Sequence, residues 1–420
     1  MDLQYHPGFI EIIDLKLKNY AGKEESVLPY FIEMNIQEDL FLSACYGDII
    51  LFDSVAFYEN FPIIGEEILT IKYKDFGSEI ITRQFFIFSV ANKEYVNEKS
   101  ATYKLEFASE EVLQNKALRY SKSFINMLAS DIAAEAFNRL NSSKPFDIVP
   151  TIGLQDYIVP YVHPFDVINA MAARSISNTN EKGSYLFYEN NKGFVYKSIE
   201  TLIKQNPTKF YIGDSHIAEI SEKMYTLKNY KYYAPINKLN NMMTGSHSVK
   251  TKTLDLINRK LDDNSYNHFS GQYSEIERVN SKNPELRTTT ESFKFTSDDS
   301  VYKLTIKNPD DTSKGTKNDV LSKRYNILSS YRNGPKIHAE LPFNAMLTVG
   351  DMVDIVIPEI NIKKTSEIVE NDKYIQGKYI VTALRQYIKP GNAVTIVEFS
   401  KDTFTQSIIE NQQKQMDNSY

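Results

Sequence analysis

Short segments of alternating apolar and polar residues occupy both ends of this chain, and they constrain its fold more than any other feature. Residues at period two are typical of half-buried β-strands, because successive side chains of a strand point to opposite faces. Six such segments lie in the first 107 residues, at 9–17, 29–36, 47–53, 68–73, 84–90 and 101–107. Six short strands with no long helix between them predict a small antiparallel barrel or sandwich.

A second group of alternating segments lies toward the other end, at 209–213, 336–342, 352–358, 378–384 and 394–399. The aromatic residues favour the same interpretation. The chain has 28 Tyr and 24 Phe but no Trp, and Tyr and Phe are enriched in strands. An AT-rich genome is a second explanation for these aromatic residues.

A different pattern occupies the middle of the chain. Ser109 and the two acidic residues after it predict a helix start, and apolar residues at largely helical spacing over the next thirty positions predict two helices with a break near 121–123. Another helix is expected at 164–175, where Pro164 suits the first helical position. A β-hairpin is expected around the turn at 190–193. This middle block is therefore α+β.

Residues 240–333 are rich in Asn, Ser, Thr, Lys and Asp. They are expected to form long loops around the strand-like islands at 252–256, 292–295 and 301–306. Together, the patterns predict an α+β fold class that is predominantly β. The predicted domains are a first β-barrel at 1–108, an α+β insert at 109–206, a second β-barrel at 207–400 with long polar insertions at about 240–333, and a C-terminal extension at 401–420.

An internal repeat links the two strand-rich regions. Gly65-Glu66 and Gly350-Asp351 each precede an alternating strand, and a Gly-acid step of this kind is typical of a chain reversal. We therefore assign these four residues a structural role in turns. A duplicated β-barrel on either side of an insert is the arrangement that such a repeat predicts.

The repeat continues downstream of each turn. The segment that begins at Phe86 resembles the one at Tyr379, and the segment that contains Phe107 resembles the one that contains Phe399. A hairpin insertion around 365–373 accounts for the longer spacing in the second copy. Phe86, Phe107, Tyr379 and Phe399 are thus candidates for barrel core and for subunit contact. Because one chain then holds two related barrels, three chains form a quasi-symmetric ring of six.

Composition excludes several classes of protein. The net charge is −6, from 48 Lys and Arg against 54 Asp and Glu, whereas a non-specific nucleic-acid binder needs a basic stripe. Cys45 is the single cysteine, so neither an intramolecular disulfide nor a thiolate metal cluster is available. The first residues lack the pattern of a signal peptide, and no stretch approaches the roughly 20 apolar residues of a membrane span. We therefore expect no membrane anchor.

Catalytic motifs are equally scarce. The six histidines are scattered, and His216 with Glu219 is the one pair at helical spacing; a surface or capping role is the prediction for it. There is no nucleophile elbow, P-loop or dinucleotide-binding motif. We predict no catalytic, cofactor-binding or metal site, and a buried position for Cys45. Arg174 is a candidate interface residue, and the aromatic run at 230–233 is expected to be a barrel strand or a subunit contact.

Two stretches carry a resemblance to a known family. The first has the segments PFDVI at 164–168, AARS at 172–175, SYLFYE at 184–189, GF at 193–194 and SIETL at 198–202. It resembles the insert domain of contractile-tail baseplate hub proteins, a family that includes the hub of T-even phages and the hub part of type VI secretion spikes. The second has LTVGDMVDIVIP at 347–358, GKYIVT at 377–382 and EFSKD at 398–402, and it resembles the second barrel of that family.

The resemblance implies a homotrimer of chains that each have two tail-tube-like barrels. Such a ring has pseudo-sixfold symmetry, binds the hexameric tail tube on one side and the trimeric central spike or tail lysozyme on the other, and contacts other baseplate proteins. It implies a structural protein of the virion tail, assembled in the host cytoplasm, with no cofactor. The net charge agrees with a lumen through which DNA passes without specific binding.

Two other functions remain open from the sequence. One is a tail-associated cell-wall hydrolase, since pairs of carboxylates such as Glu66-Glu67 occur. The other is a host-surface binding protein, although such a chain would more often end in a carbohydrate-binding β-domain than in a repeat of its own start.

Overall fold

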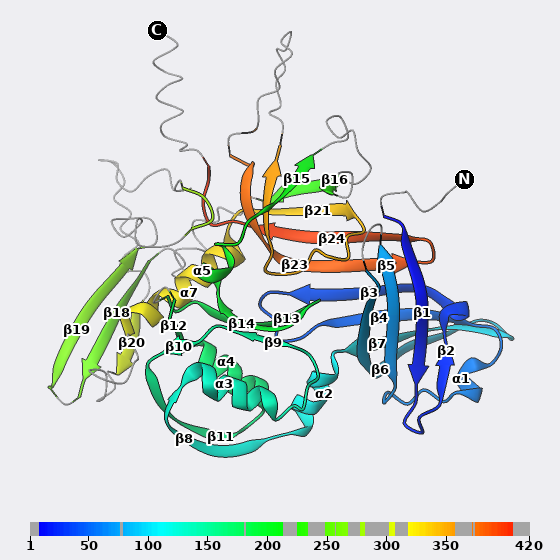
Figure 1. Ribbon diagram of the computed structural model, residues 1–420, viewed down its shortest axis with the longest axis horizontal. Helices are drawn as coiled ribbons and strands as arrows, with labels where there is room; N and C mark the ends of the chain where they lie inside the picture. Colours follow the sequence, from blue (N-terminus) through cyan, green and yellow to red (C-terminus); the bar gives the residue numbers. More distant parts are fainter. Residues whose placement is uncertain are drawn as a thin grey trace, which may run out of the picture.

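A computed structural model gives the architecture of the chain (Figure 1). It describes residues 8–75, 79–179, 182–212, 225–233, 248–256, 258–267, 278–281, 302–306, 318–357, 372 and 374–405. The described part is predominantly β, as predicted. One 14-stranded sheet includes strands from both ends of the chain, and four small sheets accompany it.

The N-terminal part contributes seven strands to the large sheet. All six predicted segments are strands, although their ends differ by a few residues. The strands are β1 (Ile10–Lys18), β2 (Glu24–Ser26), β3 (Phe31–Asp39), β4 (Tyr46–Asp53), β5 (Ile68–Asp75), β6 (Ile81–Asn97) and β7 (Ser100–Ala108). A short 3-10 helix (Leu28–Tyr30) precedes β3, and α1 (Phe57–Asn60) lies between β4 and β5.

The middle of the chain folds into helices and small sheets, with one correction to the predicted elements. Two helices do follow Ser109, but the short break expected near 121–123 is wrong: the nine-residue strand β8 separates α2 from α3 and pairs antiparallel with β11. The spacing of the apolar residues predicted a helix here, but Phe124 is buried while the next residue, Ile125, is exposed. This alternation of buried and exposed side chains is typical of a strand. The elements are α2 (Glu110–Ala117), β8 (Tyr120–Leu128), α3 (Ala129–Asn138), β9 (Phe146–Ile148), β10 (Thr151–Ile152), β11 (Leu154–Val162), α4 (Pro164–Ala172), β12 (Ile176–Ser177), β13 (Tyr185–Asn190), β14 (Gly193–Ser198) and α5 (Ile199–Leu202).

The C-terminal part returns to the large sheet and brings a second correction. Residues 318–333, which we expected to be polar loop, form helix α7 (Asn318–Asn333), whose Ile327, Leu328 and Tyr331 are buried against the sheet. The strands are β15 (Thr208–Ile212), β16 (Thr226–Leu227), β17 (Asn229–Tyr233), β18 (Ser248–Asp255), β19 (Lys260–Asn267), β20 (Tyr302–Ile306), β21 (Lys336–Pro342), β22 (Met352–Val356), β23 (Gly377–Lys389) and β24 (Asn392–Ser400). The island at 292–295 and most of 401–420 lie outside the described residues.

The two parts of the large sheet repeat a unit of five strands. In the first unit, β3 to β7 lie in the order β3-β4-β7-β6-β5, and in the second, β17 and β21 to β24 lie in the order β17-β21-β24-β23-β22. All four pairings are antiparallel in both units. Chain order, sheet order and strand direction therefore all recur, as an internal duplication requires.

A β-bulge recurs at the same place in both units. The pairing of β6 with β7 shifts after Ile87, which lies opposite Phe107, and the pairing of β23 with β24 shifts after Val381, which lies opposite Phe399. This register matches Phe107 with Phe399, as the sequence repeat does. It matches Tyr379 with Phe85, however, one residue before the Phe86 that we paired with it.

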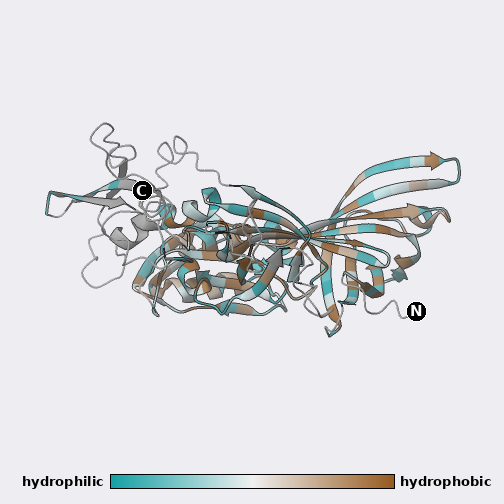
Figure 2. Ribbon diagram, turned by 90° about the horizontal axis from the view of Figure 1, so that it is seen from above, coloured by the Kyte–Doolittle hydropathy of each residue, from teal (hydrophilic) through white to brown (hydrophobic). Residues whose placement is uncertain are grey.

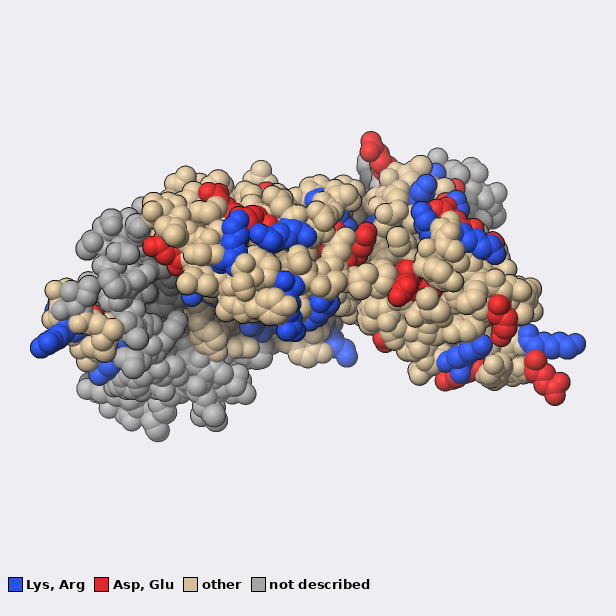
Figure 3. Space-filling model, turned by 90° about the horizontal axis from the view of Figure 1, so that it is seen from below, with Lys and Arg blue, Asp and Glu red and all other residues tan. Residues whose placement is uncertain are grey.

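Hydrophobic and hydrophilic residues alternate along the long strands in Figure 2. Lys and Arg are interspersed with Asp and Glu over the face in Figure 3, and no stripe of one sign crosses the described residues drawn there. Within the described residues, no helix is both long and apolar enough for a membrane span.

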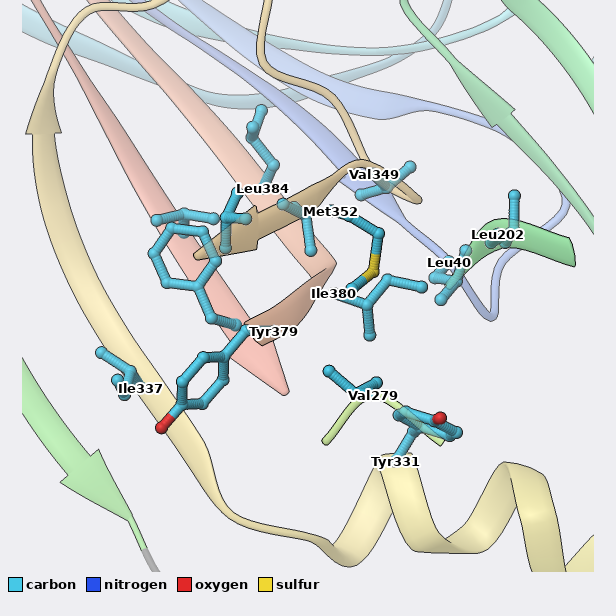
Figure 4. Close-up of a cluster of buried hydrophobic side chains, with 14 of the residues drawn as sticks. Leu40, Leu202, Val279, Tyr331, Ile337, Val349, Met352, Tyr379, Ile380 and Leu384 are labelled. Carbon is cyan, nitrogen blue, oxygen red and sulfur yellow. The ribbon is translucent and has the colours of Figure 1, made fainter. Parts of the chain in front are cut away.

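Three clusters of buried side chains form the core. One fills the first unit, one the middle block, and one the second unit together with α7. The third cluster is drawn in Figure 4, where Leu40 of the N-terminal part lies near Met352 and Ile380. In return, Phe343 and Ile388 of the C-terminal part belong to the cluster of the first unit. The two units thus share their cores at the junction.

Candidate functional site

The most distinctive polar feature is a buried ion pair where the two units meet. A guanidinium nitrogen of Arg83 on β6 lies 2.9 Å from Oε1 of Glu38 at the end of β3. The other oxygen of Glu38 accepts a hydrogen bond of 2.6 Å from the hydroxyl of Thr348, a residue of the C-terminal part. Arg83 also contacts the sulfur of Cys45 at 3.4 Å. This cluster therefore links the first unit to the turn that precedes β22 in the second unit.

A second buried cluster joins the first unit to the middle block. Glu189 of β13 accepts a 2.8 Å hydrogen bond from the backbone N–H of Cys45 and another from the hydroxyl of Ser109. Lys144 lies between Glu189 and Glu111, at 2.7 and 2.8 Å. Burial opposes the charged form of Lys144, but these two carboxylates outweigh it and raise its pKa. The residue Ser109 does stand at the helix N-cap, yet its hydroxyl binds Glu189 and not the helix backbone.

The two predicted Gly-acid turns have matching backbones. Gly65 has φ +88° and Gly350 has φ +87°, a conformation that favours glycine. The residue just before each strand accepts a backbone hydrogen bond from the neighbouring strand, at the residue where the bulge begins. The N–H of Ile87 donates to the carbonyl of Glu67 at 2.8 Å, and the N–H of Val381 donates to the carbonyl of Asp351 at 2.9 Å. The structural counterpart of Asp351 is therefore Glu67 and not Glu66.

The acidic side chains of these turns bind backbone amides. Glu67 is fully buried and accepts from the N–H groups of Ile64, Gly65 and Glu66 at 2.8 to 3.2 Å. Asp351 accepts from the N–H of Thr348 at 3.1 Å. Both acids thus hold the turn that precedes a strand, but in the first turn this acid is Glu67 and not the Glu66 that we predicted.

The predicted interface residues divide by burial. Phe107, Tyr379 and Phe399 have no exposed surface, so they belong to the core and offer nothing to a second subunit. Phe86 is half-buried. Arg174 is exposed and lies over the ring of Tyr157, 4.9 Å from its centre. The aromatic run at 230–233 is part of strand β17, as one of our two interpretations expected.

Metal-binding geometry does not emerge from the part of the chain that the structure describes. His163 and His338 are the two described histidines, and no group of three His, Cys, Asp or Glu among the described residues is placed to hold a metal ion. His216 and Glu219 lie outside that part. Cys45 is fully buried, as predicted, and burial raises the pKa of its thiol.

Sequence reasoning missed both buried clusters. Arg83 and Glu38 are 45 residues apart, and Cys45 and Glu189 are 144 apart. One local signal could have indicated the first cluster: a charged residue at a strand position that alternation predicts to be buried. Arg83 is such a residue, because its neighbours Thr82 and Gln84 are exposed.

Comparisons with known proteins agree with this architecture. No family model matches the chain. A probable baseplate hub protein of Vibrio phage KVP40 is 18% identical over 416 residues, which cover 93% of each chain.

Two solved structures share the fold. The tail protein of Neisseria meningitidis MC58 superposes with a TM-score of 0.55 at 10% identity, over 93% of this chain and 96% of its own. The 43 kDa tail protein of prophage MuSo2 from Shewanella oneidensis superposes with a TM-score of 0.52 at 12% identity, over 93% of this chain and 98% of its own. The predicted resemblance is therefore confirmed: along nearly its whole length this chain resembles a phage baseplate hub protein in sequence and phage tail proteins in fold.

Proposed function

We propose that this chain is the structural hub of a contractile phage baseplate, in which three copies form a ring that joins the hexameric tail tube to the trimeric central spike. The observation that carries the proposal is the repeated five-stranded unit within one chain. Three chains supply six such units, so a single ring presents sixfold-like strand units toward a tube and true threefold symmetry toward a spike. The baseplate resemblance supports the structural part of this role.

In this proposal each five-stranded unit closes with its neighbouring strands into a tube-like barrel, and the middle block is an insert domain at 109–206. The role is mechanical. A ring under contraction load requires large obligate interfaces, typically above about 2,000 Å². The net charge of −6 provides no overall attraction for the phosphates of DNA. This agrees with DNA that passes through the ring without binding.

The buried clusters suit such a role. Arg83, Glu38 and Thr348 tie the two units together, and Glu189 of the middle block, which Lys144 and Ser109 also bind, accepts from the N–H of Cys45 in the N-terminal part. These are charge-assisted hydrogen bonds, which are stronger than neutral ones. A ring built from such chains moves as rigid segments, and force on the tube reaches the spike without unfolding a hinge.

The test is the native mass of the purified full chain together with class-averaged electron images, alone and with the tube and spike proteins of the same phage. We expect a trimer and a ring with threefold or pseudo-sixfold symmetry. A 48.4 kDa monomer that forms no ring even with the spike present would contradict the proposal. A zymogram on bacterial cell wall separates the hydrolase alternative, because turnover that a single carboxylate substitution abolishes would replace the structural role.

A further inference from the structure

The junction between the two units within the chain is a strand pairing. Strand β23 pairs with β24 along one edge, and its other edge is shared: β22 pairs with its first residues, and β3 of the other unit pairs with Ala383 to Ile388. The pairing of β3 with β23 is antiparallel and sets Asn35 opposite Tyr387 and Met34 opposite Ile388.

The equivalent strands of the repeat lack this pairing. The counterpart of β23 is β6, which pairs with β5 only up to Phe86 and then continues to Asn97 alongside β7. The counterpart of β3 is β17, which pairs with β21. Within the described residues, no strand pairs with the second edge of β17 or with that edge of β6 beyond Phe86.

Large side chains on both of these strands are exposed. The far half of the β6–β7 hairpin projects from the rest of the molecule (Figure 2). Tyr95 and Val96 near its tip are 72% and 59% exposed, and Tyr230 and Tyr233 of β17 are 40% and 45% exposed. Unpaired edges with large exposed side chains are strong templates for pairing with another chain.

The repeat fixes the register that such a pairing would have. Through their partners on β7 and β24, Glu94 corresponds to Tyr387 and Tyr95 to Ile388. Through β4 and β21, Lys231 corresponds to Asn35 and Tyr230 to Met34.

Transferring the β3–β23 register to β17 and β6 sets Lys231 opposite Glu94 and Tyr230 opposite Tyr95. Neither Glu94 nor Lys231 has an ion-pair partner in the described part of the chain, and both side chains are exposed. Opposite charges and aromatic rings are favourable cross-strand pairs. The register follows from backbone pairing alone. The opposite charges of Glu94 and Lys231 are therefore an independent argument for a second copy of this chain as the occupant.

We propose that strand β17 of one copy pairs antiparallel with the free edge of β6 of the next copy, with Lys231 opposite Glu94 and Tyr230 opposite Tyr95. This inference rests on the trimeric ring of the proposed function and names its interface. The contact is head-to-tail, and in the proposed trimer it closes into a ring in which β3–β23 junctions within chains alternate with β17–β6 junctions between them. Closure leaves neither edge unpaired.

Charge reversal tests the ion pair. Glu94→Lys and Lys231→Glu alone each put like charges opposite one another, and we expect each to shift the monomer–trimer equilibrium toward monomer by at least about tenfold. The double variant restores the opposite pair, so it should recover most of the wild-type association by analytical ultracentrifugation. A matched control is the exposed pair Glu11–Lys74 on β1 and β5, whose reversal should leave association unchanged.

A disulfide tests the register. Directly opposed residues in antiparallel strands lie about 4.5–5.5 Å apart between Cα atoms, within disulfide reach. Tyr95→Cys with Tyr230→Cys should therefore give dimers and trimers on a non-reducing gel. Tyr95→Cys with Tyr233→Cys moves one partner about 10 Å along the strand and should give none. The buried Cys45 does not compete.

The outcomes separate the two proposals. A stable trimer that neither cross-links in this register nor responds to the reversals overturns this interface and leaves the hub intact. A chain that stays monomeric with its tube and spike proteins overturns both. Cross-linked trimers together with rescue by the double reversal support both.

Discussion

The guanidinium of Arg83 lies 2.9 Å from the carboxylate of Glu38, and both side chains are almost completely shielded from solvent. The pair joins β6 to β3, two strands of the first unit that are not neighbours in the sheet, and Thr348 brings the second unit to the same carboxylate. The ion pair is therefore a structural link between the two units.

Replacing Arg83 with Met should strongly destabilise the chain. Removal of one partner leaves the Glu38 charge buried and unpaired, which typically costs about 3–5 kcal/mol of unfolding free energy. The measurement is urea denaturation. The double variant Arg83→Met with Glu38→Gln should lose less than the two single variants together, whereas Lys74→Met, which breaks an exposed pair, should cost below about 1 kcal/mol. Strictly additive losses would show that the pair is not coupled.

Lys144→Met should loosen α2 from β13 within the middle block. Glu189 and Glu111 would lose their shared cation, and both carboxylates are nearly inaccessible to water. We expect a loss of about 3 kcal/mol and faster amide hydrogen exchange in β13 and α2. Lys197→Met removes a partner of the exposed Asp147 and is the control. If exchange rises equally in both variants, the buried cluster does not hold α2 and β13 together.

Gly350→Ala should cost more than Gly22→Ala. Both glycines have positive φ, +87° and +81°, so the two variants share a backbone strain of roughly 1–2 kcal/mol. A Cβ at position 350 would stand 2.4 Å from the hydroxyl of Tyr188, whereas one at position 22 meets nothing within 4 Å. Thermal denaturation should therefore show the larger decrease for Gly350→Ala, and equal decreases would mean that Tyr188 moves aside freely.

Asp53 should contribute stability that disappears in acid. Burial opposes its ionisation, but hydrogen bonds from the backbone N–H groups of Tyr58, Phe57 and Val55 outweigh burial and lower its pKa. A folded pKa below the unfolded value means that the unfolded state takes up protons first on acidification. The stability is thus fully present above the unfolded pKa of about 4 and is lost as the pH falls through the folded value.

The variant Asp53→Ala isolates this contribution. Its unfolding free energy should lie about 1–3 kcal/mol below that of the wild type at pH 7, and the gap should shrink as the pH is lowered below about 4. A gap that is independent of pH would show that the charge of Asp53 is not what holds α1.

Cys45 should be inert toward thiol reagents in the native chain. It is fully buried, and burial raises the pKa of its thiol, so both access and thiolate are lacking. A chromogenic disulfide reagent should report no thiol in the native protein and one per chain in urea. Rapid native labelling would mean that the cluster around Arg83 opens to solvent.

Local patterns predicted most elements because they depend on burial within a few residues. The six N-terminal strands, α4 with Pro164 at its start and the hairpin at 185–198 all appear where they were predicted. The strand β8 and helix α7 were missed. The spacing of their apolar residues does not distinguish helix from strand or loop, and the contacts of β8 with β11 and of α7 with the second unit decided instead.

The sequence by itself determined the predominantly β character, the repeat and the resemblance to baseplate hubs, since alternation and short turn motifs are local properties of a chain. Only the tertiary structure decided the register of the repeat, because the bulge shared by both units aligns Ile87 with Val381 and so matches Tyr379 with Phe85 and not with Phe86. It also decided that Phe107, Tyr379 and Phe399 are core residues and that Arg83 meets Glu38. Burial and long-range pairing depend on which segments fold against each other, and no local pattern carries that information.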